Sequence, residues 1–168
     1  MSPTPSQLHR RASRNIVTNY LKVRAGENVI IESWAHTLPF ASALLDEARR
    51  AGGRTLLVYN DEDSWWRALD RKQSKLLGES SDPEWAALRS ADVYVNFWGP
   101  SDTDRLEKFP DSDNAAFDWN WPWYEVARKA GVRGSRMTVG FVTPARAREW
   151  GVDLAKLSLI HISEPTRP

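Results

Sequence analysis

The chain has 168 residues, with 23 Lys and Arg against 22 Asp and Glu, and a formal net charge of +1. This length suits one globular domain. The evenly mixed charges exclude the clustered basic surface of a nucleic-acid-binding protein, and no stretch reaches the roughly 20 apolar residues that cross a bilayer. The absence of cysteine excludes a disulfide scaffold and cysteine-ligated zinc. With no signal-peptide pattern at the start, we expect a cytoplasmic protein that binds neither nucleic acid nor a membrane.

The first part of the chain predicts an alternation of helices and strands. Apolar residues at spacings of three and four predict a helix over about 6–23. The β-branched run at 28–33 is typical of a buried strand in a parallel sheet. A helix over about 38–51, with Pro39 in its first turn and glycines after its end, leads to a second strand at 54–59. Such a unit pairs its strands in parallel.

The same alternation continues to the end of the domain. Ser81 and Glu84 have the spacing of a capping box and predict the start of another helix. Strands are expected at 92–98 and 136–142, with a helix over about 121–130 between them and a further helix beginning at Thr143. The sequence therefore predicts an α/β fold, a three-layer sandwich with a mainly parallel sheet of about four or more strands.

Ligands of parallel sheets bind beyond the carboxyl ends of the strands. In this chain that edge is expected to gather residues 34–36, 60–63 and 98–102. We therefore take Trp34, His36 and Trp98 as candidate residues of a substrate cleft. The alternative for His36 is that it caps or approaches the following helix. Metal binding by a lone imidazole falls short of the three or four ligands that zinc takes.

Two groups of carboxylates have competing interpretations. Asp61, Glu62 and Asp63 could bind magnesium or calcium, but they lack the spacing of a calcium loop, which favours a solvated turn with a helix cap at Asp63 or Ser64. A second group lies in a polar connection, where a catalytic pair would need a shared cleft: Asp111, Asp113 and Asp118. The HExxH, GxxxxGK, GxGxxG and GxSxG signatures are absent. The sequence thus assigns no catalytic and no metal-binding residue.

Nine tryptophans are many for this length. Trp119, Trp121 and Trp123 alternate just before a predicted helix and could form a platform for a sugar or an aromatic ligand. Large aromatic side chains more often supply core or interface area. We therefore expect the tryptophans to form a surface toward another domain or subunit.

The final segment, residues 157–168, reads LSLIHISEPTRP and matches the translation of a transposase adapter used in sequencing libraries. We therefore exclude it from the fold, as an expression scar would be excluded. The expectation is that residues 1–156 form the domain and that the natural chain continues beyond Lys156.

The order of the elements, together with several short blocks, resembles the N-terminal domain of the aminopeptidase T family of metallopeptidases. The blocks that carry the resemblance are Leu21–Ile30, Ala41–Gly52, Ala91–Val95, Gly134–Gly140 and Val142–Arg148. It covers essentially all of residues 6–156.

The resemblance implies a two-domain enzyme that removes N-terminal residues from peptides, using two divalent metal ions of the zinc, cobalt or magnesium type. In the family these ions are held by Glu, His and Asp of a C-terminal domain, where they generate hydroxide and polarise the peptide carbonyl. The chain is then the non-catalytic part of the parent enzyme and is itself inactive. Its expected partners are a peptide substrate, the missing C-terminal domain and, as an open possibility, a second copy in a homodimer. A free-standing α/β domain that binds a small molecule, or an interaction domain, is the alternative.

Overall fold

A parallel four-stranded sheet forms the centre of the molecule. The structure, a computed structural model, describes residues 5–97, 99–102, 105, 108–109, 120–137, 148 and 151. The strands follow the spatial order β2-β1-β3-β4 and all neighbours are parallel. Their bounds are β1 Asn28–Trp34, β2 Arg54–Asn60, β3 Val93–Phe97 and β4 Arg133–Met137. The predicted α/β class with a parallel sheet is confirmed.

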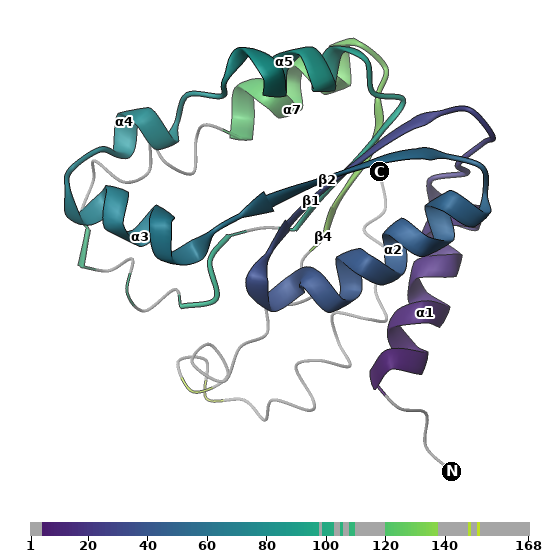
Figure 1. The fold of residues 1–168 in the computed structure, drawn as a ribbon, viewed down its shortest axis with the longest axis horizontal. Helices are drawn as coiled ribbons and strands as arrows, with labels where there is room; N and C mark the ends of the chain where they lie inside the picture. The colour runs from purple at the N-terminus through teal and green to yellow at the C-terminus, as the bar shows by residue number, and fades with distance from the viewer. Residues whose placement is uncertain are drawn as a thin grey trace.

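Helices cover both faces of this sheet and complete the three layers (Figure 1). On one face lie α1 (Pro5–Asn15), which continues as a π-helical turn at Ile16–Tyr20, and α2 (Leu38–Arg50), which follows a 3-10 turn at Ala35–Thr37. On the other face lie α5 (Asp82–Arg89) and α7 (Asn120–Lys129). The helices α3 (Glu62–Asp70) and α4 (Ser74–Leu77) lie beyond the carboxyl ends of the strands, in the connection from β2 to α5.

Alternation along the strands divides the apolar residues between two cores. Val29 and Ile31 of β1 pack with Val95 and Phe97 of β3 against the α1 and α2 layer. The intervening residues Ile30 and Tyr94 pack with Leu88 of α5 and Ala127 of α7. Each large aliphatic side chain buried in this way stabilises the fold by about 1.5–3 kcal/mol. Both faces of β1 and β3 are therefore covered, which explains their continuous apolar runs.

Most predicted helix and strand bounds agree with the structure. The predicted capping box is confirmed, because the Ser81 hydroxyl accepts the Glu84 amide and the Glu84 carboxylate accepts the Ser81 amide. The predicted helix over 6–23 is α-helical only to Asn15. Its last turn widens to a π-helix, in which the amide of Leu21 donates to the Ile16 carbonyl at 2.7 Å. This turn places Val17 and Leu21 in the core.

The predicted cap at Asp63 or Ser64 is wrong. Asp61 caps α3, because its Oδ2 accepts the Ser64 amide at 2.8 Å. The fourth strand begins at Arg133, three residues before the predicted start at 136. The Arg133 guanidinium donates to the Leu21 and Lys22 carbonyls, both at 2.7 Å, which holds the start of β4 against the first helix. Residues 138–142 and the predicted helix that begins at Thr143 lie outside the described residues, apart from the isolated 148 and 151.

The expectation of a tryptophan surface is wrong for three of the nine. Trp34, Trp65 and Trp66 are 5%, 8% and 4% exposed and belong to the core. Trp34 meets Trp65 edge-on at 5.8 Å between ring centroids, and Trp65 meets Trp66 at 4.8 Å. These rings fill the space between α3 and the end of β1. Trp119 and the side chains of Trp121 and Trp123 lie outside the described part of the chain.

Candidate functional site

The carboxyl ends of β1, β2 and β3 bring three segments together, as the parallel topology predicts. His36 comes from the 3-10 turn after β1, Glu62 from the first turn of α3, and Ser101 from the loop after β3. Local hydrogen bonds fix the first of these segments: the Thr37 hydroxyl accepts the Trp34 amide at 3.0 Å. This cluster of His36, Glu62 and Ser101, with Trp66, is the candidate site, and we call it the edge cluster.

Glu62 lies at the centre of the edge cluster. Its Oε1 accepts the Ser101 amide at 2.9 Å, the Ser101 hydroxyl at 2.8 Å and the Trp66 indole N–H at 3.2 Å. Its Oε2 lies 3.7 Å from Nδ1 of His36. Burial raises the pKa of Glu62, but the interaction with His36 and the hydrogen bonds from Ser101 and Trp66 outweigh burial and bring the pKa to about 2. Glu62 is therefore an anion at neutral pH.

This carboxylate is suited to positioning and not to proton transfer. A base with a pKa of about 2 takes up little proton at neutral pH, where general bases work best with a pKa near the working pH. Its location in the first turn of α3 also favours the charged form. Glu62 thus ties the end of β1, the start of α3 and the loop after β3 into one rigid edge.

His36 is the partly exposed member of the edge cluster, although both of its ring nitrogens are buried. The ring is 18% exposed, and neither Nδ1 nor Nε2 has a hydrogen-bond partner within the described part of the chain. The 3.7 Å separation from Glu62 is longer than a hydrogen bond, so the contact between the two is electrostatic. His36 does not cap α2, which has no side-chain cap hydrogen bond, but it lies in the turn that leads directly into this helix, as the alternative interpretation allows. The exposed part of the His36 side chain therefore consists of carbon atoms, and its two unpartnered nitrogens lie beneath the surface.

Of the other two predicted cleft residues, the structure describes only Trp34. Trp34 is a core residue, and its indole N–H donates to the Phe97 carbonyl at 3.0 Å, beneath the edge. Trp98 lies outside the described residues, as do Asp111, Asp113 and Asp118. The role of Trp34, His36 and Trp98 in a substrate cleft remains a prediction.

A second polar cluster, inside the sheet, was missed from the sequence. Glu32 of β1 is 2% exposed, and its carboxylate accepts the Tyr94 hydroxyl and, at 2.8 Å, the Asn60 amide. Asn96, 4% exposed, is the register partner of Glu32 in β3, and its Oδ1 has no hydrogen-bond partner among the described residues. Burial raises the pKa of Glu32, against the lowering effect of its two hydrogen bonds. The sequence does contain a sign of this cluster, since Glu32 is a carboxylate within the apolar run of residues 28–34.

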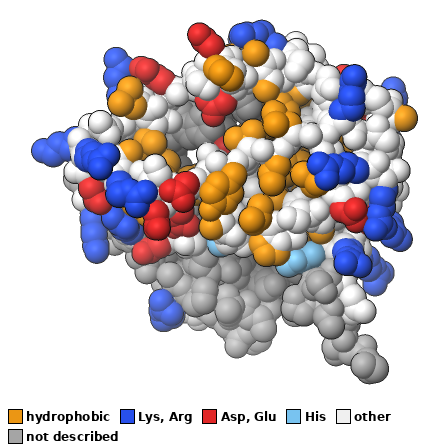
Figure 2. All heavy atoms as spheres, in the orientation of Figure 1, with side chains coloured by type: hydrophobic (Ala, Val, Ile, Leu, Met, Phe, Trp, Pro, Cys, Tyr) orange, Lys and Arg blue, Asp and Glu red, His pale blue; other side chains and the backbone are white. Residues whose placement is uncertain are grey.

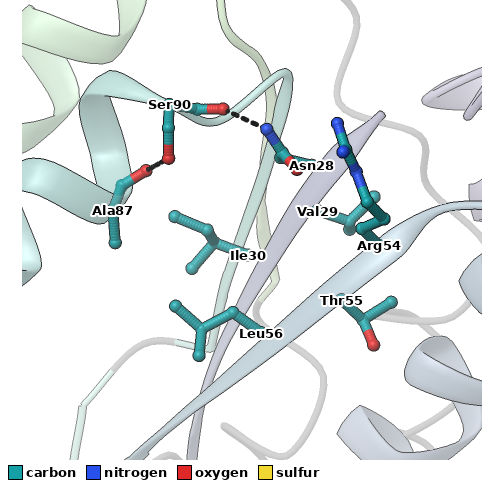
Figure 3. Close-up of a pocket in the computed structure, with 8 residues that line it drawn as sticks. All are labelled: Asn28, Val29, Ile30, Arg54, Thr55, Leu56, Ala87 and Ser90. Carbon is teal, nitrogen blue, oxygen red and sulfur yellow. Dashed lines mark hydrogen bonds between the residues drawn. The ribbon is translucent and has the colours of Figure 1, made fainter. Parts of the chain in front are cut away.

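A shallow hollow of about 200 Å³ lies at the opposite, amino-terminal end of the sheet (Figure 3). Ile30 and Leu56 of the strands and Ala87 of α5 give it an apolar floor, while Arg54, Asn28 and Ser90 lie at one end. Val29 and Thr55 complete the lining. The hollow exists because α5 packs over β1 and β3 and leaves β2 uncovered, so that Leu56 is 46% exposed.

Metal binding was tested on the donor groups that the structure brings together. Among the described residues, no three His, Asp, Glu or Cys side chains lie close enough to hold a metal ion. The family resemblance assigns the two-ion centre to a C-terminal domain and none of its ligands to this chain. In the same described ranges, no helix combines the length and apolar character needed to cross a bilayer.

Comparison with solved structures gives a likeness of fold. No family model matches the chain, and no curated protein sequence matches it significantly. A solved structure of wild-type AmpT from Thermus thermophilus is similar to the chain with a TM-score of 0.57 and 20% sequence identity. The similarity covers 76% of this chain and 33% of that one, so the chain spans about a third of the length of AmpT. At this identity the likeness shows the fold alone.

Proposed function

We propose that residues 1–156 are the N-terminal, non-catalytic part of a metal-dependent aminopeptidase that hydrolyses N-terminal residues from peptides. The observation that carries the proposal is the shared fold with AmpT over 76% of this chain. The resemblance of short sequence blocks to the aminopeptidase T family led to the same family. Because the match spans only 33% of AmpT, the activity belongs to the parent protein and this chain alone is expected to be inactive.

The two divalent ions of the parent are proposed to take their ligands from the remainder of that protein, as the family resemblance implies. No step of hydrolysis is therefore assigned to a residue of this chain. Its contribution is a wall of the substrate cleft, built from the edge cluster.

Within that wall, His36 is the residue proposed to meet the peptide. Its ring nitrogens have no hydrogen-bond partner among the described residues but are buried, so they can bond to the amide and carbonyl groups of a peptide only after the ring turns outward. Glu62 is proposed to hold the His36 ring in place from the side of Nδ1. Such a contact made equally in the ground state and the transition state affects KM more than kcat.

Peptidase assays of the chain and of the recovered longer parent test this proposal. Leucine p-nitroanilide is a suitable substrate, with and without a chelator. The expected result is chelator-sensitive hydrolysis by the parent and none by residues 1–168. In the parent, H36A should raise KM with little change in kcat, and the control E79Q, at an exposed glutamate of the α4 to α5 connection, should change neither. A parent without peptidase activity contradicts the proposal, and an unchanged KM in H36A removes the role of His36.

The hollow beside α5 is the one observation that favours a second function, a free-standing domain that binds a small molecule. Its volume of about 200 Å³ lies below the roughly 300–1,000 Å³ of sites that enclose drug-sized ligands. This size restricts the ligand to a small fragment or a single side chain. We therefore place this function second.

A further inference from the structure

The hollow beside α5 is built on two register pairs of the parallel sheet. Asn28 of β1 lies beside Arg54 of β2, and Ile30 lies beside Leu56, the next pair on the same face. Side chains two residues apart point to the same side of a strand, so all four face the side of the sheet that carries α5. Figure 3 shows the polar pair at one end of the hollow and the apolar pair along its floor. The hollow thus offers a polar end and an apolar floor to one small ligand.

Arg54 is a cation without a carboxylate partner at the polar end. It is exposed and forms no ion pair within the described ranges of the chain. Glu27, which precedes β1, pairs with the Arg133 guanidinium instead. Asp92, which precedes β3, accepts the Asn28 amide at 2.8 Å through its Oδ2. The charge of Arg54 therefore favours an anionic ligand, and a guanidinium binds a carboxylate through two parallel hydrogen bonds.

The other polar groups of this end bond to one another and fix its shape. Nδ2 of Asn28 donates to the Ser90 carbonyl at 2.7 Å, and the Ser90 hydroxyl donates to the Ala87 carbonyl at 2.8 Å. These bonds join the start of β1 to the end of α5 (Figure 3). The wall of the hollow is thus preformed, and the Arg54 guanidinium is the charged donor that a ligand meets.

The floor of the hollow is apolar and open to solvent on the side of β2. Leu56 is 46% exposed, whereas Ile30 beside it is buried. In Figure 2 a band of hydrophobic side chains crosses the middle of the view, in the region where Figure 1 places β2. A hydrocarbon group that covers Leu56 removes apolar surface from water, which favours binding.

The volume of the hollow limits the size of the ligand. The hollow holds about 200 Å³. Because a water molecule takes up about 30 Å³ in the liquid, this volume has room for about seven non-hydrogen atoms. A carboxylate group occupies part of this space and leaves room for about four carbon atoms. A nucleotide or an oligosaccharide is therefore too large, whereas a short branched acid fits.

We propose that this hollow binds a small, free aliphatic carboxylate. The carboxylate pairs with the Arg54 guanidinium, and the branched hydrocarbon part covers Leu56, Ile30 and Ala87. The site lies at the amino-terminal end of the sheet, at the opposite end from the edge cluster. It does not depend on the proposed function, because a longer parent enzyme and a free-standing domain would both retain it.

Backbone-amide NMR of the 168-residue chain, titrated with isovalerate, tests the proposal. The expected result is a set of saturable shifts at the starts of β1 and β2 and at the end of α5. The Kd should be about 1–10 mM, because a shallow hollow covers only part of the ligand. Isovaleramide has the same shape without the charge, and acetate has the charge without the hydrocarbon part. Each should bind at least about tenfold more weakly than isovalerate.

Two variants separate the contributions of charge and apolar surface. R54Q should weaken the binding of isovalerate at least about tenfold and leave that of isovaleramide unchanged. L56Q should weaken the binding of both compounds. R71Q is the matched control, because Arg71 is an exposed arginine after α3 and lies outside the hollow. Since all three side chains are exposed, the variants should fold, and unchanged NMR signals away from the hollow check this.

Several results would overturn the proposal. These are the absence of saturable shifts at about 50 mM isovalerate, equally tight binding of isovaleramide, or an R54Q chain that binds isovalerate as tightly as the unchanged chain. Binding of acetyl-glycyl-leucine without binding of isovalerate would overturn it as well, because it assigns the hollow to a peptide C-terminus. Shifts that follow the protein concentration alone would assign the hollow to a second copy of the chain and would equally contradict it.

Discussion

The buried carboxylate of Glu32 makes the stability of the domain depend on pH in an unusual direction. Burial raises its pKa in the folded state, with a smaller contribution in the same direction from the charge of Glu84, while Tyr94 and Asn60 act against it. The folded state therefore holds the proton more tightly than the unfolded chain, where a glutamate has a pKa of about 4.3. Stability from this group is fully present below about pH 4.3 and is lost as the pH rises through the folded pKa.

Replacing Glu32 by Gln removes this dependence. For one proton the free energy of unfolding changes by up to about 1.4 kcal/mol per pH unit in the window between the two pKa values. At acidic pH, E32Q should be less stable than the unchanged chain by about 1–3 kcal/mol. Asn60 donates to Oε1 of Glu32 and Tyr94 donates to Oε2, and in a glutamine one of these two positions is an NH2 group, which does not accept. As the pH rises from 5 to 8 this deficit should shrink or reverse, because the unchanged chain must ionise a buried group and the variant does not.

Urea unfolding followed by tryptophan fluorescence at pH 5, 6, 7 and 8 measures this difference. Trp34, Trp65 and Trp66 in the core provide the signal. E79Q is a suitable control, because Glu79 is 59% exposed and makes only a 4.0 Å contact with Lys75. Glu62 does not interfere, since its pKa is lowered to about 2 and its contribution changes below this window. A deficit of E32Q that stays constant from pH 5 to pH 8 refutes the reasoning.

Three further substitutions test the edge cluster, the start of α5 and the turn after α2. E62Q should lower the free energy of unfolding at pH 7 by about 1–2 kcal/mol after allowance for solvent screening. The pKa of Glu62 is lowered to about 2 in the folded state, so its stabilising effect is present above the unfolded pKa and is lost as the pH falls toward 2. Acid titration of both chains checks the direction of this pH dependence. S81A removes the capping box of α5 and should lower the free energy of unfolding, measured by thermal unfolding, by about 1 kcal/mol. Retention of full stability would show that Glu84 alone caps this helix. G52A should destabilise by about 1–2 kcal/mol or more, because Gly52 has φ +85° and a Cβ there would lie 2.9 Å from the Ala25 Cα; unchanged urea unfolding contradicts this.

Much of the fold could be predicted because local signals and the topology agree. The apolar runs of β1 and β3, the Pro39 start of α2 and the capping box of α5 each indicate the element that forms. Parallel pairing then follows from the helical crossovers. The start of β4 was missed because Arg133 and Gly134 carry little strand propensity. Contacts of Arg133 with the distant Leu21 and Lys22 carbonyls determine it instead.

The site was predicted at the level of segments and not of contacts. Topology placed His36, Glu62 and the loop of Ser101 at one edge of the sheet, as the structure shows. That Glu62 accepts from Ser101 and Trp66 depends on side-chain directions across three elements, which sequence spacing does not give. The same applies to Trp34, whose position after a strand suggested a cleft, although its ring fills the core beneath that edge.

We propose that this chain is the N-terminal part of a longer metal-dependent aminopeptidase, and sequencing of the native locus across the codons for residues 157–168 tests this proposal. The expected result is that the codons of LSLIHISEPTRP are absent there and that the reading frame continues into a domain that carries Glu, His and Asp ligands. Finding those codons in the locus, followed by a stop codon, would contradict the proposal and favour a small ligand-binding domain.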